Sequence, residues 1–96
     1  MQFDRDCPLI LREFLSYHEN IKAQSKKTIS EYYLDLRMFL RFIVLIKNEM
    51  PYHTDLETIS IRTVDAELLR LVTVNDVYDF LSYLANDRVK NPDSMS

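Results

Sequence analysis

The sequence predicts an all-α fold, a small bundle of helices. The chain has 96 residues and no glycine, whereas globular proteins contain about 7% glycine and tight β-hairpins depend on it. Apolar residues recur at intervals of three and four along three segments, which is the pattern of an amphipathic helix. Hydrophobic residues make up 47% of the chain and charged residues 28%, a balance that favours a globular protein over a disordered one.

The first helix is expected from Pro8 to about residue 20 or 21. Proline suits the first position of a helix, and Asp6 or Cys7 would then be the cap. The second helix is expected from Ser25 to Lys47 and should be about 30 Å long at 1.5 Å per residue. Its C-terminal half is apolar on almost every side, so this helix should lie at the centre of the bundle.

The second half of the chain has weaker signals. Residues 48–64 show little periodicity and are interpreted as a long connection. Asp65 is placed to cap one or two helical turns, and Thr73 to cap a last helix over residues 74–88, with Asp76 at its third position. The apolar positions that indicate this last helix are Val74, Val77, Tyr78, Leu81, Leu84 and Ala85.

Length and composition limit the class of protein. A chain of 96 residues makes one domain, here residues 1–96, with flexible ends expected at 1–6 and 90–96. Cys7 is the only cysteine, so an internal disulfide is impossible and a reducing compartment is favoured. No apolar run reaches the roughly 18 residues of a membrane span, and the first residues lack the features of a signal peptide. We therefore expect a cytoplasmic protein with no membrane contact.

The charge of the chain is unevenly distributed. Its formal net charge is −3, which is unusual for a nucleic-acid-binding protein. Residues 20–47 nevertheless carry six cations and two anions, whereas residues 48–87 carry two cations and eight anions. One face could therefore approach a phosphate backbone while another is repelled from it.

The start of the second helix is the strongest functional signal. If Ser25 is the N-cap, Lys26 and Lys27 take the first two helical positions, where the helix dipole disfavours a cation by about 0.3–1 kcal/mol. A phosphate from outside would remove this conflict, because phosphates bind readily at helix N-termini. Alternatively, Thr28 is the cap and Glu31 completes a capping box, which leaves the lysines just before the helix. The lysines could also be ordinary solvated side chains.

No catalytic or metal-binding arrangement is visible. His18 and His53 are far apart and have no cysteine or carboxylate cluster at the spacing of metal ligands, and a glycine-rich phosphate loop is impossible without glycine. We therefore expect no cofactor, no metal and no small-molecule substrate. Most tyrosines fall on apolar faces, with Tyr32 and Tyr78 as core candidates, whereas Tyr33 is expected to point with the lysines toward a phosphate or sugar.

Three segments together resemble a known family. The first two are Phe14-Leu15-x-Tyr17 and Ser25-x-x-Thr28-Ile29-x-x-Tyr32-x-x-Asp35-Leu36-x-x-Phe39-x-x-Phe42. The third is Thr73-x-x-Asp76-Val77-x-x-Phe80-Leu81-x-Tyr83-Leu84. This pattern, from about Pro8 to Arg88, resembles the N-terminal core-binding domain of tyrosine recombinases, the SAM-like domain of phage-type integrases, and in particular its Xer-like branch.

The resemblance implies a fold and a role. The fold would be a SAM-like orthogonal bundle, here lacking its last helix, which usually begins about where this sequence ends. The domain would bind double-stranded DNA together with other recombinase protomers, and the family's catalytic residues belong to a separate domain, so this chain alone would not cleave DNA. The resemblance places Ser25, Lys26, Lys27 and Thr28 at phosphates, and Ser30, Tyr33 and Arg37 along the wall of the major groove.

Two departures from the family pattern matter. Family members often have glycine before the serine, where this chain has Gln24, so the geometry of that turn is open. The missing last helix would expose an apolar flank of the second or third helix, and an exposed apolar patch favours self-association.

A different class of function is the main alternative. A small helical module that binds other proteins fits the acidic net charge, and one fold can serve many purposes. In that case the polar start of the second helix is merely solvated. A self-contained enzyme is a third hypothesis, but it would need a metal or nucleophile site that the sequence does not show.

Overall fold

A computed structural model describes residues 5–87 of the chain. No strand occurs within this range, which confirms the predicted all-α bundle. The expectations for residues 1–4 and 88–96 lie outside the described residues. The elements, in chain order, are α1 (Leu9–Asn20), α2 (Lys26–Lys47), the 3₁₀ turn η1 (Leu56–Thr58), α3 (Ala66–Arg70), α4 (Val74–Ser82) and the π-helical turn η2 (Tyr83–Asp87).

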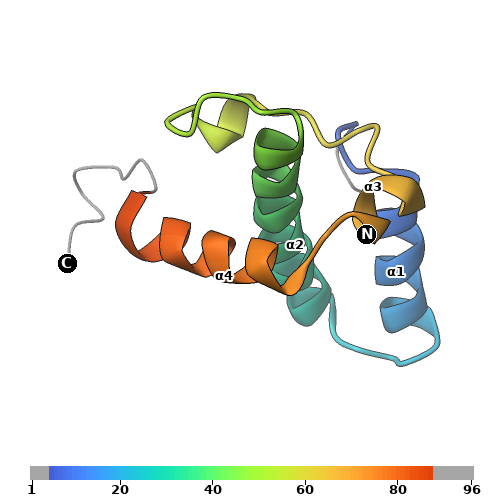
Figure 1. Cartoon of the computed structure of the whole chain (residues 1–96). Coiled ribbons are helices and arrows are strands. Elements are labelled where there is room, and N and C mark those ends of the chain that lie inside the picture. Colours follow the sequence, from blue (N-terminus) through green and yellow to red (C-terminus); the bar gives the residue numbers. More distant parts are fainter. Residues whose placement is uncertain (1–4, 88–96) are drawn as a thin grey trace.

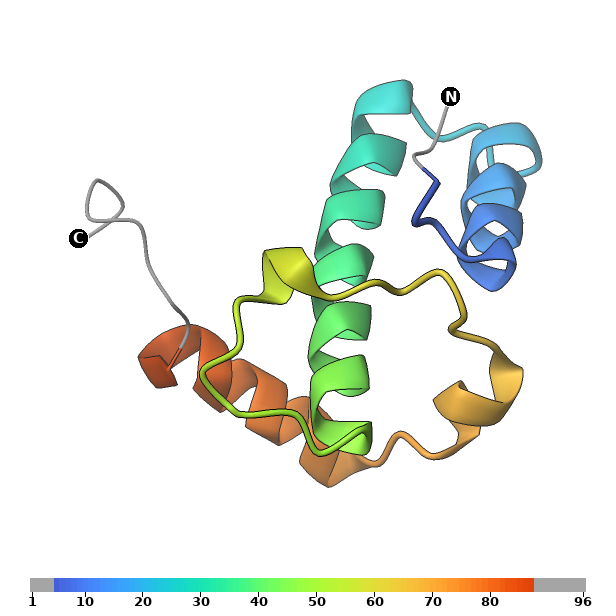
Figure 2. The same ribbon diagram turned by 90° about the horizontal axis from the view of Figure 1, so that it is seen from above.

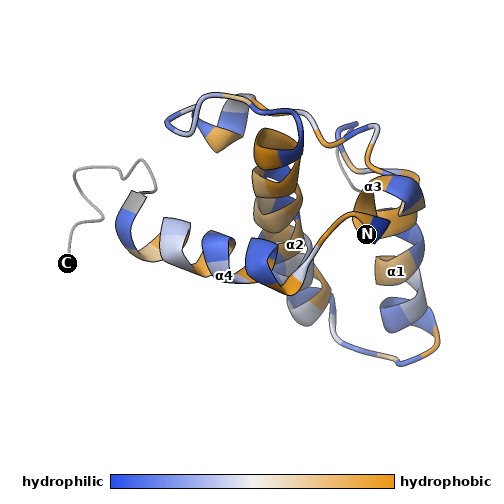
Figure 3. Ribbon diagram, viewed as in Figure 1, coloured by the Kyte–Doolittle hydropathy of each residue, from blue (hydrophilic) through white to orange (hydrophobic). Residues whose placement is uncertain are grey.

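Helix α2 forms the axis of the bundle. In Figure 1, α1 lies beside α2 and α4 crosses it steeply, and Figure 2 shows that α4 begins near the C-terminal end of α2. The connection from α2 to α3 passes back across α2 (Figure 2). Figure 3 shows hydrophobic residues concentrated along the C-terminal part of α2. This arrangement agrees with the prediction that the longest helix is central.

Two hydrophobic clusters form the core, and α2 contributes to both. The first cluster joins α1 to α2 and consists of Cys7, Leu11, Leu15, Ile29, Tyr33, Leu40, Ile61 and Val64. The second cluster gathers on the C-terminal half of α2 and consists of Phe42, Ile43, Leu45, Leu56, Ile59 and Tyr83. Together the two clusters bury the apolar half of α2, so the polar start of the same helix is the part that remains at the surface.

The connection between α2 and α3 is part of the core, although its sequence predicts only a long loop. Four of its apolar side chains are buried, namely Leu56, Ile59, Ile61 and Val64. The Asp55 carboxylate caps η1 by accepting a hydrogen bond from the backbone N–H of Glu57 at 3.0 Å. Periodicity could not reveal this burial, because the segment contains only one short turn of regular structure.

The start of α1 differs slightly from the prediction. Pro8 is itself the N-cap, in an extended conformation, and the helix begins at Leu9. Asp6, which the sequence offers as a possible cap of α1, does not cap the helix. Its carboxylate accepts hydrogen bonds from the Ser60 hydroxyl and from the backbone N–H of Ile61. This carboxylate therefore links the described residues before α1 to the α2–α3 connection.

Helix α4 packs through a face that differs from the one its apolar spacing predicts. Tyr83 is buried, and the Phe80 and Tyr83 rings lie 5.4 Å and 5.1 Å from the Phe42 ring, measured between centroids. Tyr78, a predicted core residue, is 63% exposed, so that prediction is wrong. Aromatic rings bury more apolar area than valines and gain from ring–ring contact, which favours the observed face. The apolar residues of α4 that are exposed are Val74, Val77, Tyr78 and Leu81, and we call them the exposed apolar flank of α4.

Within residues 5–87, two residues adopt the left-handed backbone conformation in the absence of glycine. They are Ala23, with φ of 53°, and Glu49, with φ of 54°. Glu49 follows α2, and the backbone N–H groups of Glu49 and Met50 bond the carbonyls of Ile46 and Leu45 at 3.2 Å and 2.9 Å. This is the Schellman arrangement, which satisfies carbonyls at a helix end and offsets the roughly 1–2 kcal/mol that a left-handed conformation costs a residue other than glycine.

Asp76 fixes the start of α4 to the end of α2. Its carboxylate accepts a hydrogen bond from the Thr73 N–H at 2.8 Å, while the Thr73 hydroxyl accepts one from the Asp76 N–H at 3.1 Å, which is the predicted capping box. The same carboxylate lies 2.9 Å from the Lys47 ammonium group. The hydrogen bonds from Lys47 and Thr73 hold the pKa of Asp76 below its ordinary value.

Acid should therefore destabilise the protein in part through Asp76. Because its folded pKa lies below the unfolded value of about 3.9, its contribution to the free energy of unfolding is complete above that pH and is lost as the pH falls through the folded pKa. We expect Asp76→Asn to lower the free energy of unfolding by about 1–3 kcal/mol near neutral pH and to reduce the loss of stability below about pH 4. Urea unfolding at several pH values measures both effects. The exposed Asp79→Asn on the same helix is the control, and equal pH dependence in the two variants would contradict this role.

Candidate nucleic-acid interface

Helix α2 begins with Ser25 as its N-cap. The Ser25 hydroxyl oxygen accepts a hydrogen bond from the backbone N–H of Thr28 at 3.1 Å, and the two hydroxyl oxygens lie 3.0 Å apart. The helix starts at Lys26, and its first turn contains no acidic residue. Of the two predicted starts, the structure thus has the one in which the lysines occupy the first turn.

A polar network holds the turn that leads into α2. The Nδ1 atom of His18 lies 2.9 Å from the side-chain oxygen of Gln24, and the Gln24 amide donates to the Tyr32 hydroxyl at 3.3 Å. Ala23 takes the left-handed conformation in this turn. Gln24 therefore does not need the backbone freedom of the glycine found in the family, and its side chain links α1 to α2. His18 therefore has a structural role in this turn.

The lysines at the start of α2 are available to a ligand. Ser25, Lys26 and Lys27 are exposed, while Thr28 and Ser30 are half-buried. Among residues 5–87, no ion pair involves either lysine. Two ammonium groups therefore add their charge to the positive end of the helix dipole, and this combination favours binding of an anion.

Tyr33 lies in the core, so the prediction that it points with the lysines is wrong. It is 6% exposed and belongs to the first hydrophobic cluster. Its position, four residues after Ile29 and seven before Leu40, places it on the buried face of α2. The Arg37 guanidinium lies over its ring, with 5.3 Å between the guanidinium carbon and the ring centroid. Tyr33 therefore supports Arg37 through a cation–π contact.

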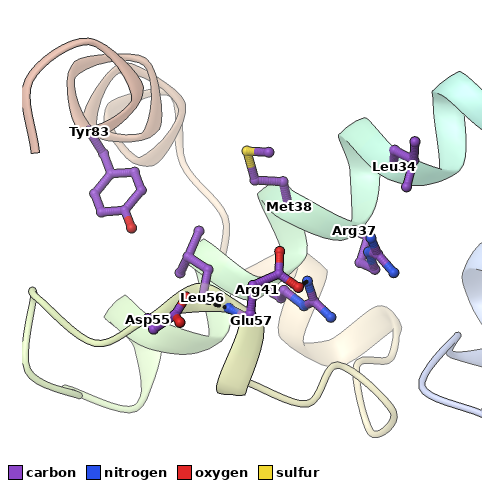
Figure 4. Close-up of a pocket in the computed structure, with 8 residues that line it drawn as sticks. All are labelled: Leu34, Arg37, Met38, Arg41, Asp55, Leu56, Glu57 and Tyr83. Atoms are coloured by element: carbon purple, nitrogen blue, oxygen red, sulfur yellow. Dashed lines mark hydrogen bonds and ion pairs between the residues drawn. The ribbon is translucent and has the colours of Figure 1, made fainter. Parts of the chain in front are cut away.

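The polar side of α2 extends further than predicted. Counting from Lys26, helical spacing brings Ser30, Arg37 and Arg41 onto the same side, along about 22 Å of helix. Arg41 is absent from the predicted contacts, although its spacing of four residues from Arg37 was a usable signal. Figure 4 shows both arginines beside a pocket of about 270 Å³. The other residues that line it are Leu34, Met38, Asp55, Leu56, Glu57 and Tyr83.

The described part of the chain offers little support for other kinds of site. Within residues 5–87, no three His, Cys, Asp or Glu side chains are grouped so that they could hold a metal ion. No helix in this range has the length and apolar character needed to cross a bilayer. Cys7 is buried in the first hydrophobic cluster.

Sequence comparison identifies the family. The chain is 38% identical over 85 residues to the "Tyrosine recombinase XerC" of Caldanaerobacter subterraneus subsp. tengcongensis, and the match covers 88% of this chain and 24% of that protein. This identity supports a Xer-like tyrosine recombinase domain, as the sequence pattern predicts, and the chain spans about a quarter of the length of this curated relative. No family model matches the chain, and no solved structure matches it.

The two possible caps of α2 can be separated by mutation. We expect Ser25→Ala to lower the free energy of unfolding by about 1 kcal/mol, because the Thr28 N–H loses its acceptor. Thr28→Val removes a hydroxyl whose partner is the Ser25 hydroxyl, so it should have a smaller effect. Urea denaturation of both variants gives the comparison. A larger loss of stability for Thr28→Val would indicate that Thr28 is the functional cap.

Proposed function

We propose that this chain is a non-catalytic DNA-binding domain, residues 1–96, of a cytoplasmic Xer-like tyrosine recombinase. It would hold double-stranded DNA through α2, by the phosphate backbone and the major groove, during DNA integration or recombination. Other recombinase protomers would bind the same DNA. The catalytic residues would belong to the remainder of the recombinase, because the match covers only 24% of the relative.

The start of α2 is the observation that supports this proposal. Lys26 and Lys27 occupy a first turn with no acidic residue and no ion pair among the described residues. Ser25 and Thr28 are at the same end of the helix and can offer backbone or hydroxyl groups to a phosphate. Ser30 and Arg37, both half-buried, would follow on the same side of α2 toward the groove wall. Tyr33 would act beneath Arg37 rather than on the DNA itself, because it is buried.

The charge distribution limits the affinity of this domain. The basic residues are concentrated in 20–47, and the acidic residues in 48–87. The acidic half repels a phosphate backbone, so binding depends on the orientation of α2 toward DNA. We expect weak binding that falls steeply with salt concentration, because backbone contacts dominate.

A role in protein binding is the second candidate function, and two surfaces favour it. One is the exposed apolar flank of α4 described above. The other is an apolar pocket of about 360 Å³ between α1, α2 and α3. Its lining residues are Ile10, Leu11, Phe14, Leu36, Phe39, Leu40 and Leu69. Exposed apolar surface of this kind is typical of sites that contact another protein.

The DNA proposal is tested by removing the two lysines. Lys26→Ala combined with Lys27→Ala should weaken binding to all duplex sequences alike, and it should flatten the slope of log K against log salt by about 0.9 for each phosphate that the lysines neutralise. Fluorescence anisotropy with short duplexes at several salt concentrations measures both quantities. Arg62→Ala with Arg70→Ala removes the same charge from the acidic half of the chain and is the matched control. Unchanged affinity of the lysine variant would contradict the proposed role of the lysines.

NMR titrations of the unmodified chain distinguish the two candidate functions. Duplex DNA should shift the backbone amide signals of residues 24–37. A module that binds only proteins would leave these signals unchanged with DNA and would respond to its protein partner around residues 73–87.

A further inference from the structure

The pocket beside Arg37 and Arg41 contains a buried charge that is only partly bonded. The Arg41 side chain is 10% exposed. One of its terminal nitrogens donates to the Glu57 carboxylate at 3.2 Å, while its Nε–H is buried and has no hydrogen-bond partner among the described residues. A guanidinium carries five N–H donors, and buried donors without acceptors are destabilising. The pocket therefore has unused capacity to bind an anion.

Glu57 is a weak partner for this guanidinium. Its side chain is 72% exposed, and exposed ion pairs of this kind contribute little. The neighbouring Asp55 carboxylate is already committed to the backbone as the cap of η1. Glu57 can therefore turn into solvent with the loss of one ion pair, whereas Asp55 cannot leave without opening η1.

The two arginines are placed to act on one group. They come from successive turns of α2 and line the same pocket, with Glu57 approaching from the connection that crosses the helix (Figure 4). Guanidinium groups bind phosphate oxygens through two parallel hydrogen bonds. A nucleic-acid strand that follows the polar side of α2 from Lys26 would reach the half-buried Arg37 and then the pocket that contains Arg41.

We propose that this pocket is a phosphate subsite of the DNA interface, in which Arg41 and Arg37 bind one backbone phosphate. Glu57 occupies Arg41 when no DNA is bound and is displaced by the phosphate. The subsite rests on the proposed DNA-binding function and extends it beyond the start of α2. Glu57 acts as an internal competitor that lowers the affinity for DNA.

If Glu57 competes with a DNA phosphate for Arg41, a single substitution of Glu57 should raise the affinity for DNA. Glu57→Gln removes the competing charge and should raise the affinity for a short duplex by about threefold or more. Glu13→Gln on α1 removes the same charge from an exposed residue outside the pocket, so it should raise the affinity clearly less. In an Arg41→Lys background the gain from Glu57→Gln should disappear, because lysine keeps the charge but cannot form the two parallel bonds. Fluorescence anisotropy measures the affinities, and thermal melts show that each variant folds.

The Arg41 Nε–H signal gives an independent measurement. It should shift in the NMR spectrum when duplex DNA binds to the unmodified chain, and when inorganic phosphate is added to the Glu57→Gln variant. Equal gains in Glu57→Gln and Glu13→Gln, or a gain that persists with Arg41→Lys, would overturn the subsite. DNA binding through Lys26 and Lys27 would still stand if their double variant binds more weakly.

A complete failure of duplex binding has a different meaning. It would overturn the proposed function, and the phosphate titration of Glu57→Gln would then decide the chemistry of the pocket. A shift of the Arg41 signal with inorganic phosphate alone would assign the pocket to free phosphate and reject DNA as its source. No shift would reject an anion site altogether.

Discussion

The two ends of helix α2 require opposite environments, and the rest of the structure depends on this constraint. The C-terminal half of α2 is apolar and must be buried, whereas its first turn carries Lys26 and Lys27 and must stay in water. The fold meets both demands by packing its two hydrophobic clusters against α2 and by leaving the start of the helix at the surface. At the far end, Asp76 pairs with Lys47 and caps α4, so one carboxylate fixes the direction of the crossing helix.

The same packing holds the basic side chains of α2 that would contact DNA in the proposed function. The cap at Ser25 and the network of His18, Gln24 and Tyr32 hold the first turn in place without an acidic side chain. Further along the helix, the buried ring of Tyr33 supports the Arg37 guanidinium. A cation held in position by the core loses less conformational entropy on binding than a mobile one. The core thus contributes to the proposed interface through residues that do not touch the ligand.

The protein presents two kinds of surface with different physical character. The polar side of α2 offers cations and half-satisfied hydrogen-bond donors, whereas the flank of α4 and the pocket between α1, α2 and α3 offer apolar area. In a recombinase these properties are compatible, since a domain that holds DNA also works beside other protein domains. The connection between α2 and α3 is acidic, and Glu57 on it pairs with Arg41 at 3.2 Å. In the proposed DNA-binding role, such internal anions would disfavour contact between a phosphate backbone and the acidic part of the chain.

The sequence by itself determined the features that depend on neighbours within a few residues. The caps at Asp65 and Thr73 and the family pattern belong to this group, because a cap bonds an N–H only two or three residues away. For α2 the sequence left Ser25 and Thr28 as alternative caps, and the structure has Ser25. Only the tertiary structure decided which faces are buried. Tyr33, expected at the surface, is buried, and Tyr78, expected in the core, is exposed. The α2–α3 connection is part of the core. Arg41, on the polar side of α2, lines a pocket together with Glu57. When a helix carries apolar residues on two faces, its own sequence does not determine which face is buried. Contacts with residues distant in the chain decide this, here with Ile61 for Tyr33 and with Phe42 for Phe80 and Tyr83.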